Sequence, residues 1–492
     1  MDVSAFLEDI QRTPDYRGQI VHVHREPARP ATYAEPAAPL TPAGRRVLEA
    51  LGVERLYTHQ AQAVDAVRDG KDVLVVTGTA SGKTLCYLLP VFELLARDPS
   101  ARVLALYPTK ALTQDQFRVF RRVADGAGYS DIGMGVYDGD TPARQRRRLR
   151  DDARILLSNP DMLHAGILPR HGAWSRFFRG LRILVVDELH TYTGLFGANA
   201  ANLFRRFDRV CRHYGVPPRV ICCSATIGNP AELAERVVGR RVALIDRDGA
   251  PRGERTSVLW NPPRERHRRR RSRRSANVEA HELMASLVGR KIPTITFSKA
   301  KATAELIHRY VRESLRKEAP LLADRITPYR GGYLPAERRE IERRLFEGEL
   351  LGVSTTRALE LGIDVGGLDA SIVVGYPGTL ASFFQQAGRA GRRGEASLVI
   401  LIALDTAINQ YIVKHPEYIF GRPVEEGVVE PDNPYVLLGQ LRCACHELPL
   451  RAREVDLFGE VARLGHEVLQ SQHKDHREND DWYHAAPETP QY

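Results

Sequence analysis

The feature that most constrains this chain is a strand, loop and helix pattern in residues 73–92. Four consecutive aliphatic residues, 73–76, predict a buried strand, and apolar residues recur at helical spacing from Leu85 to Phe92. Between them, residues 77–84 read Thr-Gly-Thr-Ala-Ser-Gly-Lys-Thr. Small residues let backbone N–H groups approach phosphates, and the helix N-terminus adds partial positive charge. The pattern therefore predicts a phosphate-binding loop.

Two residues of this loop have predicted roles. Lys83 is placed to contact the β- and γ-phosphates of ATP, and the Thr84 hydroxyl to hold Mg²⁺. Thr77 stands where the first glycine of such a loop is usual. The alternative is a flexible surface turn, which the strand and helix on either side disfavour. We expect the loop to bind ATP through Lys83, Thr84 and the residues before them, Thr79, Ala80, Ser81 and Gly82.

Composition limits the class of protein. The chain has 492 residues, which suggests about three domains of roughly 150 residues. A net charge of +10 favours a polyanionic partner such as nucleic acid. The six scattered cysteines suggest no disulfide framework, so we expect a reducing cytoplasm. No apolar run reaches about 18 residues, so we expect no membrane partner.

Strand and helix patterns alternate over most of the chain, which predicts an α/β fold with parallel sheets. Polar clusters follow the apolar strands, where a doubly wound α/β domain forms its ligand crevice. The predicted domains are an extended N-terminal arm, a first α/β domain, a basic linker, a second α/β domain and a short helical C-terminal extension. Their expected bounds are 1–45, 46–250, 251–280, 281–415 and 416–492.

An acidic pair, Asp187 and Glu188, follows the predicted strand at 183–186. Phosphoryl transfer to water needs a metal ligand and a group that orients or deprotonates the water. Adjacent carboxylates can divide these roles, with Asp187 on Mg²⁺ and Glu188 on the water. The alternative, a solvated acidic turn, is disfavoured by the apolar strand before the pair. The neighbouring His190 reads equally well as a plain surface histidine.

Gln60 lies shortly before the predicted phosphate loop. Its amide can hydrogen-bond the edge of an adenine, with the nearby aromatic ring of Tyr57 stacked on the base. An ordinary helix start explains these residues equally well. The small hydroxyl residues Ser224 and Thr226 at another strand end are mostly found capping a following helix.

Two arginine-rich segments have two interpretations each. Arg389 and Arg392 lie three apart between glycines, which suits arginine fingers that reach a nucleotide, although such a pair is more often a solvated helix face. The run 264–274 contains eight arginines and can grip a nucleic-acid backbone or form a charged hinge. For the run, the two interpretations are compatible.

The ordered set of motifs resembles a superfamily 2 helicase over roughly residues 55–410. More narrowly, it is similar to the YprA- or MrfA-like DExH helicases, bacterial enzymes linked to mitomycin-damage repair, and to their fungal RecQ-like relatives. The segments that carry the resemblance are 77–84, 108–110, 158–164, 187–192 with 194–197, 224–226, 356–369, 385–392, 433–435 and 447–450.

The resemblance implies two tandem RecA-like domains with ATP in the cleft between them, and a 3′-to-5′ DNA translocase. It implies hydrolysis by Lys83, Thr84, Asp187 and Glu188, completed by Gln385, Arg389 and Arg392, with Gly362 and Asp364 beside the nucleotide. The residues expected to line the nucleic-acid strand are Thr109, Lys110, Asp161, Arg330, Thr356 and Arg357.

The resemblance also implies a cellular role and leaves rivals. The expected partners are single-stranded or tailed DNA and a repair nuclease, in the cytoplasm at the nucleoid. An RNA helicase of the same fold would use the same residues. A nucleic-acid-binding scaffold without turnover is disfavoured by the intact Lys83 and Glu188.

The C-terminal residues depart from the pattern of these relatives, which continue into a domain with a four-cysteine zinc site. Cys443 and Cys445 lack the usual zinc-ligand spacing, so we expect no zinc. The short C-terminus is either natural or truncated. We therefore expect ATPase activity with weak or absent unwinding.

Overall fold

A computed structural model of the chain describes residues 1–267, 270–361, 366–391, 394–451, 454, 457–459, 461–462, 475–478 and 481–484. The chain forms two compact units, each built on one seven-stranded sheet. The first-sheet unit comprises residues 33–77, 82–249 and 426–492. The second-sheet unit comprises residues 1–32, 78–81 and 250–425. Each sheet is largely parallel and flanked by helices, which confirms the predicted α/β class.

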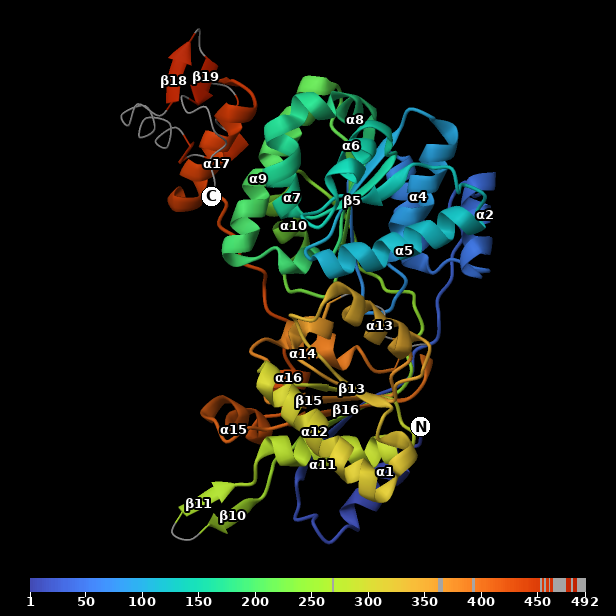
Figure 1. Cartoon of the computed structure of the whole chain (residues 1–492), viewed down its shortest axis with the longest axis vertical. Coiled ribbons are helices and arrows are strands. Elements are labelled where there is room, and N and C mark those ends of the chain that lie inside the picture. The colour runs from blue at the N-terminus through green and yellow to red at the C-terminus, as the bar shows by residue number, and fades with distance from the viewer. Residues whose placement is uncertain are drawn as a thin grey trace. The chain divides into compact units, whose positions relative to one another are not determined.

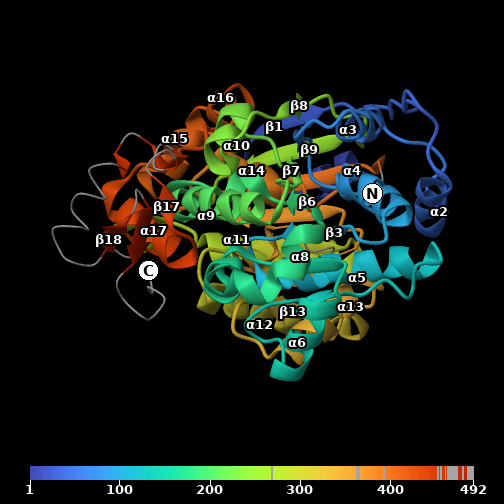
Figure 2. The ribbon, with the colours of Figure 1, turned by 90° about the horizontal axis from the view of Figure 1, so that it is seen from above.

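The first sheet is parallel in every pair of neighbouring strands. Its central β6 lies between β3 and β7 (Figure 2). Because every strand except the edge strand β8 is mostly apolar and buried on both faces, helices must cover both sides. The strand order is β4 (Met134–Val136), β5 (Ile155–Ser158), β3 (Arg102–Leu106), β6 (Leu181–Val186), β7 (Arg219–Ser224), β2 (Val73–Val76) and β8 (Ala243–Ile245).

Two hydrophobic cores sandwich the first sheet, and alternate residues of each strand enter opposite cores. In β2, Val73 and Val75 pack on one side, and Leu74 and Val76 on the other. The first side is covered by α2 (Pro42–Leu51), α3 (Thr58–Arg68), α4 (Thr84–Arg97) and α5 (Lys110–Gly126). The second is covered by α6 (Ala143–Asp152), α8 (Ser175–Gly180), α9 (Gly194–Tyr214) and α10 (Pro230–Val238) together with the short turns α7 (Pro160–Met162), η1 (Leu163–Ile167), η2 (Leu168–Trp174) and η3 (Leu189–Thr191).

The second sheet is parallel except at one edge, where β1 pairs antiparallel with β9. Its order is β1 (Ile20–Glu26), β9 (Arg255–Trp260), β16 (Ser397–Ile402), β15 (Ala370–Val374), β12 (Thr294–Phe297), β14 (Gly352–Thr355) and β13 (Ile326–Tyr329). The helical elements of this unit are α1 (Val3–Gln11), α11 (Ala276–Gly289), α12 (Lys301–Glu318), η4 (Pro320–Leu322), α13 (Pro335–Phe346), η5 (Arg357–Leu359), α14 (Leu380–Ala387), α15 (Ala407–Lys414) and α16 (Glu417–Phe420).

The N-terminal residues are more structured than the predicted extended arm. Phe6 and Leu7 of α1 enter the same core as Trp260 of β9, and β1 extends the second sheet. The apolar residues Ile20, Val21 and Val23 belong to this strand. The proline-rich stretch that follows obscured the strand in the sequence. Residues 1–26 are therefore an integral part of the second-sheet unit.

The segment 251–280, predicted as a basic linker, instead contains a core strand, a hairpin and the start of α11. Val258, Leu259 and Trp260 of β9 are almost fully buried, because β9 lies between β1 and β16. The arginines belong to the antiparallel hairpin of β10 (Arg264–His267) and β11 (Arg270–Arg273), which projects from its unit (Figure 1). The high arginine content of the hairpin concealed the short apolar run before it.

The described C-terminal residues form α17 (Pro434–Glu447) and a small sheet in the order β17, β19, β18. Its strands are β17 (Leu450–Arg451), β18 (Asp475–Glu478) and β19 (Asp481–His484). Helix α17 packs against α9, so this segment is joined to the first-sheet unit. Among the described residues, no helix is long and apolar enough to cross a membrane.

Candidate ATP site and strand-end residues

The predicted phosphate loop connects β2 to α4 with an unusual backbone. Ala80 and Gly82 have positive φ angles, +59° and +80°, which turn the chain sharply before the helix. A Cβ atom at Gly82 would lie 2.6 Å from Gln60 Nε2, so a larger residue there would be both strained and crowded. The loop therefore has the tight, close-approach conformation that the sequence predicts.

Two hydrogen bonds fix Gln60 against this loop. Its Nε2 donates to the Gly82 carbonyl at 3.0 Å, and its Oε1 accepts from the Tyr57 backbone at 2.9 Å. The side chain is almost fully buried. The helix-start interpretation matches the structure, because Gln60 closes the first turn of α3 and also holds the loop, and recognition of adenine by Gln60 stays a prediction.

Lys83 ends the loop, and its Nζ donates to the Thr77 carbonyl at 2.9 Å. Ser81 Oγ donates to the Gly78 carbonyl at 2.9 Å. Thr84 is the first residue of α4. The Lys83 ammonium is thereby folded over the loop at the N-terminus of a helix, where anionic groups are electrostatically favoured.

The acidic pair follows β6, and β7 lies between β6 and β2 in the same parallel sheet. Asp187 is 8% exposed, and its Oδ1 accepts from the Glu188 backbone N–H at 2.8 Å. Burial, and then repulsion from the charge of Glu188, raise the pKa of Asp187 to about 7. Glu188 has φ +53°, a rare conformation for a residue with a side chain. Such strain and such a pKa shift are typical of functional sites.

His190 is the residue whose importance the sequence analysis missed. Its Nδ1 accepts a hydrogen bond from the Ala225 backbone at 3.1 Å and lies 3.5 Å from Glu188 Oε2. Burial lowers the pKa of His190 below its usual value, and an accepting Nδ1 places the ring proton on Nε2. His190 therefore lies between the acidic pair and the segment after β7. That segment does more than cap the helix that follows it. The Asp-Glu-Leu-His spacing was the signal available.

Three residues expected near nucleic acid lie at the ends of β3 and β5, which are neighbours in the first sheet. Thr109 Oγ1 accepts from the Leu112 backbone at 3.3 Å and caps α5. Lys110 Nζ lies 2.9 Å from Asp140 Oδ1, and Asp161 is exposed in the first turn of α7. Because parallel strands end at one edge, the fold brings these residues to the same side of the sheet.

The second-sheet unit presents its polar residues more deeply. Arg389 is 3% exposed, and its Nη2 donates to the Glu360 carbonyl at 2.6 Å. Gln385 is buried in α14, one residue before Gln386, which donates to Glu360 Oε2 at 2.9 Å. Arg389 is thus held by the segment after β14 and is no solvated helix-face arginine.

The residues expected on the nucleic-acid strand also follow strands of the second sheet. Thr356 and Arg357 follow β14, and Arg357 Nη2 donates to the Pro377 carbonyl. Arg330 follows β13, pairs with Glu305 Oε1 at 2.7 Å, and lies over the ring of Tyr333. Gly362, Asp364 and Arg392 lie outside the described residues.

Family comparisons cover both units. Residues 57–233 match the DEAD/DEAH box helicase family, and residues 279–394 match the helicase conserved C-terminal domain. Residues 429–492 match the winged helix domain of the ATP-dependent helicase HRQ1. The sequence analysis missed this third match, because the polar tail conceals the short strands β18 and β19.

The chain aligns with curated relatives over most of its length. It is 46% identical over 445 residues to the uncharacterized ATP-dependent helicase YprA of Bacillus subtilis, spanning 90% of this chain and 59% of that protein. It is 36% identical to the ATP-dependent helicase HRQ1 of Saccharomyces cerevisiae, over 98% of this chain and 45% of that one. The chain thus spans about half the length of these relatives.

A solved structure agrees with this likeness. The DUF1998 helicase MrfA bound to DNA and AMPPNP has a TM-score of 0.92 at 42% identity, covering 100% of this chain and 67% of that one. A structure of MrfA bound to DNA has the same TM-score and identity, with 64% of that chain covered. At this similarity, both sequence and fold are shared.

A cluster of buried side chains holds α17, which lies in the region that matches the winged helix domain, against α9 of the first-sheet unit. Arg206 of α9 is fully buried and pairs with Glu447 of α17, where its Nε lies 3.0 Å from Oε2. Arg206 Nη1 also contacts Gln440 Oε1 at 2.7 Å and His164 Nδ1 at 2.9 Å. These contacts fix α17 on α9. Among the described residues, no three His, Cys, Asp or Glu side chains form a metal-binding group.

Proposed function

The chain belongs to the YprA/MrfA-like branch of the superfamily 2 helicases, with two RecA-like domains, and from this we propose that it is an ATP-driven DNA translocase. The observation that carries the proposal is the strand-end cluster of the first sheet. Asp187 is buried, with the half-buried Glu188 and His190 beside it, and one strand, β7, separates β6 from β2 and its phosphate loop. The related helicase MrfA has a solved structure with both DNA and AMPPNP bound.

Each residue of the loop has a distinct task in the proposed ATP site. The backbone at Thr79–Gly82 follows the phosphates, and Lys83 exchanges its bond to the Thr77 carbonyl for the terminal phosphates. Thr84 and Asp187 would hold Mg²⁺, which neutralises phosphate charge during transfer. Burial and the charge of Glu188 raise the pKa of Asp187 more than the charge of Lys83 lowers it, so a further positive charge would stabilise the carboxylate. The donor set therefore suits a hard divalent ion.

Glu188 is proposed as the group that takes a proton from the attacking water. Glu188 has an αL backbone, and we propose that the two carboxylates serve different partners. Burial lowers the pKa of His190, whose Nδ1 accepts from the Ala225 N–H, so the neutral ring lies beside Glu188 without protonating it. Gln60 is proposed to recognise adenine once its bonds to the loop and Tyr57 rearrange.

The second-sheet unit is proposed to complete turnover. Gln385, Arg389 and Arg392 would act on the terminal phosphate, with Gly362 and Asp364 beside the nucleotide. Arg389 suits a role as an arginine finger because its guanidinium is anchored by the Glu360 carbonyl, so little freedom is lost when it acts. We propose that residues 46–250 and 281–415 carry the motifs of the two domains, with β1 and β9 completing the second sheet.

DNA is proposed to bind along the strand ends of both units, in the 3′-to-5′ direction of movement. The residues proposed to contact its backbone are Thr109, Lys110, Asp161, Arg330, Thr356 and Arg357. Phosphate contact by such residues gives affinity with little sequence preference. By family resemblance we further propose a role in DNA repair, in the cytoplasm at the nucleoid, together with a repair nuclease.

The test is steady-state ATP hydrolysis by the purified chain with single-stranded DNA, with RNA and without nucleic acid. We expect stimulation by DNA and little by RNA. Strand displacement on 3′-tailed and 5′-tailed duplexes then tests the direction, and we expect a response to the 3′ tail. Stimulation by RNA alone would identify an RNA helicase, and no hydrolysis would identify a binding scaffold.

A further inference from the structure

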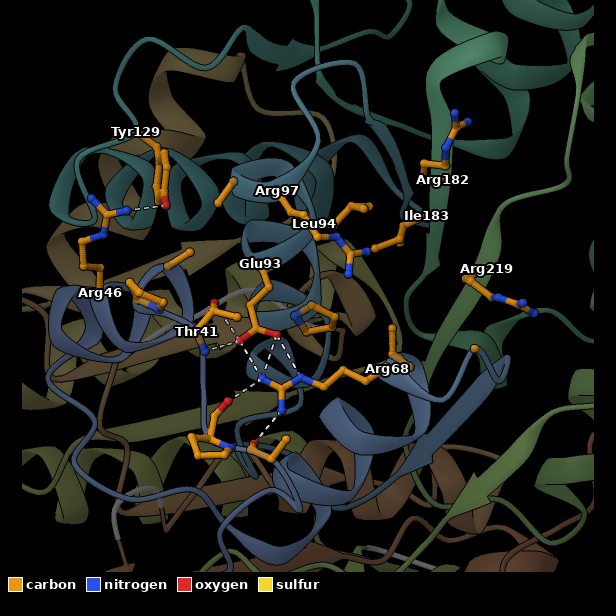
Figure 3. Close-up of a pocket in the computed structure, with 18 residues that line it drawn as sticks. Thr41, Arg46, Arg68, Glu93, Leu94, Arg97, Tyr129, Arg182, Ile183 and Arg219 are labelled. Carbon is orange, nitrogen blue, oxygen red and sulfur yellow. Dashed lines mark hydrogen bonds and ion pairs between the residues drawn. The ribbon is translucent and has the colours of Figure 1, made fainter.

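A second pocket opens in the first-sheet unit, at the opposite end of the strands from the acidic pair (Figure 3). It has a volume of about 830 Å³, a size common for ligand sites. Arg182 and Ile183 at the start of β6 and Arg219 at the start of β7 form one side. Arg97, the last residue of α4, lies about 20 Å from the phosphate loop, since α4 has 14 residues.

The pocket is strongly cationic. Five arginines line it, and Glu93 is the one acidic side chain among its lining residues. Glu93 is already neutralised, because Arg68 Nη2 contacts its Oε1 at 2.8 Å and Arg68 Nε contacts its Oε2 at 3.1 Å. The Thr41 backbone also donates to Glu93 at 2.9 Å. The remaining four arginines leave an uncompensated positive charge.

Two of these four arginines are available to a ligand. Arg97 and Arg219 are exposed and make no hydrogen bond or ion pair with any residue in the described part of the chain. Arg46 instead donates to Tyr129 Oη at 2.6 Å, and Arg182 donates to the Arg179 carbonyl at 2.8 Å. Figure 3 shows the Arg97 and Arg219 side chains without a marked partner.

The walls between the arginines are apolar. They include Pro39, Pro42, Pro90, Val67 and Leu94. Prolines have no N–H group, so the pocket offers few backbone donors for clustered phosphates. The Ala38 and Pro39 carbonyls, which are acceptors, already bind Arg68. The walls therefore offer mainly surface for an apolar side chain.

We propose that this pocket docks a partner protein through an acidic segment with an apolar anchor. The anchor packs on the proline and leucine walls, and flanking carboxylates pair with Arg97 and Arg219. Arginine binds carboxylates through two parallel hydrogen bonds, which gives both strength and orientation. Spaced carboxylates on a peptide match separated arginines with an apolar floor better than a continuous row of phosphates does. The site is separate from the ATP site, so docking and turnover can occur together.

The probe is a fluorescein-labelled 12-residue peptide in which four glutamates flank a central Leu-Trp-Leu, measured by fluorescence anisotropy with the full chain. We expect saturable binding that weakens with added salt. The charge-reversing pair Arg97→Glu with Arg219→Glu should weaken it at least tenfold. The matched control, Arg144→Glu with Arg147→Glu on the exposed face of α6, changes net charge equally and should stay within twofold.

A second variant tests the apolar anchor without altering charge. Ala96→Trp adds a ring to an exposed lining position of the pocket and should also weaken binding tenfold. A peptide with serines in place of Leu-Trp-Leu should lose the same factor. All these variants should keep the wild-type unfolding midpoint, which shows that they are folded whether or not the proposed function holds. DNA-stimulated ATP hydrolysis should also be unchanged.

Three results would overturn the proposal. The first is no peptide binding at 100 μM peptide, roughly the weak end of peptide recognition. The second is equal weakening by the α6 control variant, and the third is equal binding of the serine peptide. Displacement of the peptide by a 12-nucleotide oligothymidylate, sensitive to the same Arg97 and Arg219 changes, would assign the pocket to nucleic acid instead.

Discussion

The two sheets of this chain share an architecture but carry different chemistry at their strand ends. The first sheet ends in a phosphate loop and an acidic pair, the buried Asp187 and the half-buried Glu188. The second ends in Gln385 and Arg389, with no loop of the Gly-Lys-Thr type. In the proposed site, the first set would bind phosphate and handle water, and the second would supply positive charge. On this proposal, neither unit alone holds a complete set of groups for hydrolysis.

The way each unit holds its charged groups also differs. Burial of Asp187, and then repulsion from the half-buried Glu188, raise the pKa of Asp187, which suits it to a cation. Arg389 Nη2 already donates to the Glu360 carbonyl. We therefore expect the largest single effect from a change in the first-sheet unit.

The largest effect is expected for Lys83→Ala. It removes the ammonium at the terminal phosphates, and loss of one such group costs up to about 1000-fold in turnover. Hydrolysis in the presence of single-stranded DNA measures it. Lys71→Ala, which removes an exposed lysine paired with Asp69 in the same unit, is the control and should behave like wild type. Near-normal turnover in Lys83→Ala would remove the loop from the site.

Glu188→Gln should lower turnover by about 100-fold, because general-base catalysis contributes about that much or more. ATP and DNA binding should persist, since the amide is isosteric and the charge of Asp187 remains. Binding of a fluorescent ATP analogue, compared with turnover, separates the two effects. Glu235→Gln, an exposed position on α10, serves as the control. A hydrolysis rate close to that of wild type would give the proton-accepting role to another group.

A pH-dependent effect is expected at His164, within the cluster that fixes α17. Burial and then the charge of Arg206 lower the pKa of His164 to about 4, below its usual value of 6.5. The unfolded chain therefore takes up a proton first, and stability is lost as the pH falls from about 6.5 towards 4. His164→Gln keeps an acceptor for Arg206 but cannot titrate.

Between pH 7.5 and pH 4.5, the wild type should lose about 1–2 kcal/mol more unfolding free energy than His164→Gln, after allowing for partial exposure. Denaturant unfolding at several pH values, followed by far-UV circular dichroism, measures this difference. Parallel pH profiles for the two proteins would show that His164 is not neutral in the folded state.

The smallest effect is expected from the hairpin of β10 and β11. Replacing the arginines at 264, 266, 270, 271, 273 and 274 with serine should lower single-stranded DNA affinity and its salt dependence. Each lost phosphate contact reduces the magnitude of the log affinity against log salt slope by about 0.7. Titrations from low to moderate salt measure the slope. An unchanged slope would leave the hairpin a structural role alone.

The sequence predicted well which residues follow the strands of the first sheet, because this depends on local order. Lys83 and Glu188 each follow an apolar strand, and parallel strands must end at one edge. Contacts between distant segments were harder to predict. The bond from Ala225 to His190 and the burial of Arg206 against Glu447 join residues 35 and 241 positions apart. Periodicity does not indicate such pairs, because they depend on how helices and strands pack.

Composition also misled the sequence analysis in two places. The arginine run suggested a linker although Val258 and Trp260 just before it form a core strand. The proline-rich stretch suggested an extended arm although β1 pairs with β9. In both cases a short apolar strand lies beside a longer segment of opposite character. Whether such a strand pairs at a sheet edge and becomes buried depends on tertiary structure. Local propensity does not indicate it.

The comparison of the two units is tested most directly by DNA-stimulated ATP hydrolysis of Arg389→Ala. We predict a fall of about 100-fold with little loss of ATP binding, since positive charge matters most as the terminal phosphate departs. Arg309→Ala, an exposed arginine on α12 of the same unit, should retain wild-type turnover. Wild-type turnover in Arg389→Ala, with the unfolding midpoint unchanged, would show that the first-sheet unit hydrolyses ATP without the second and would contradict the account.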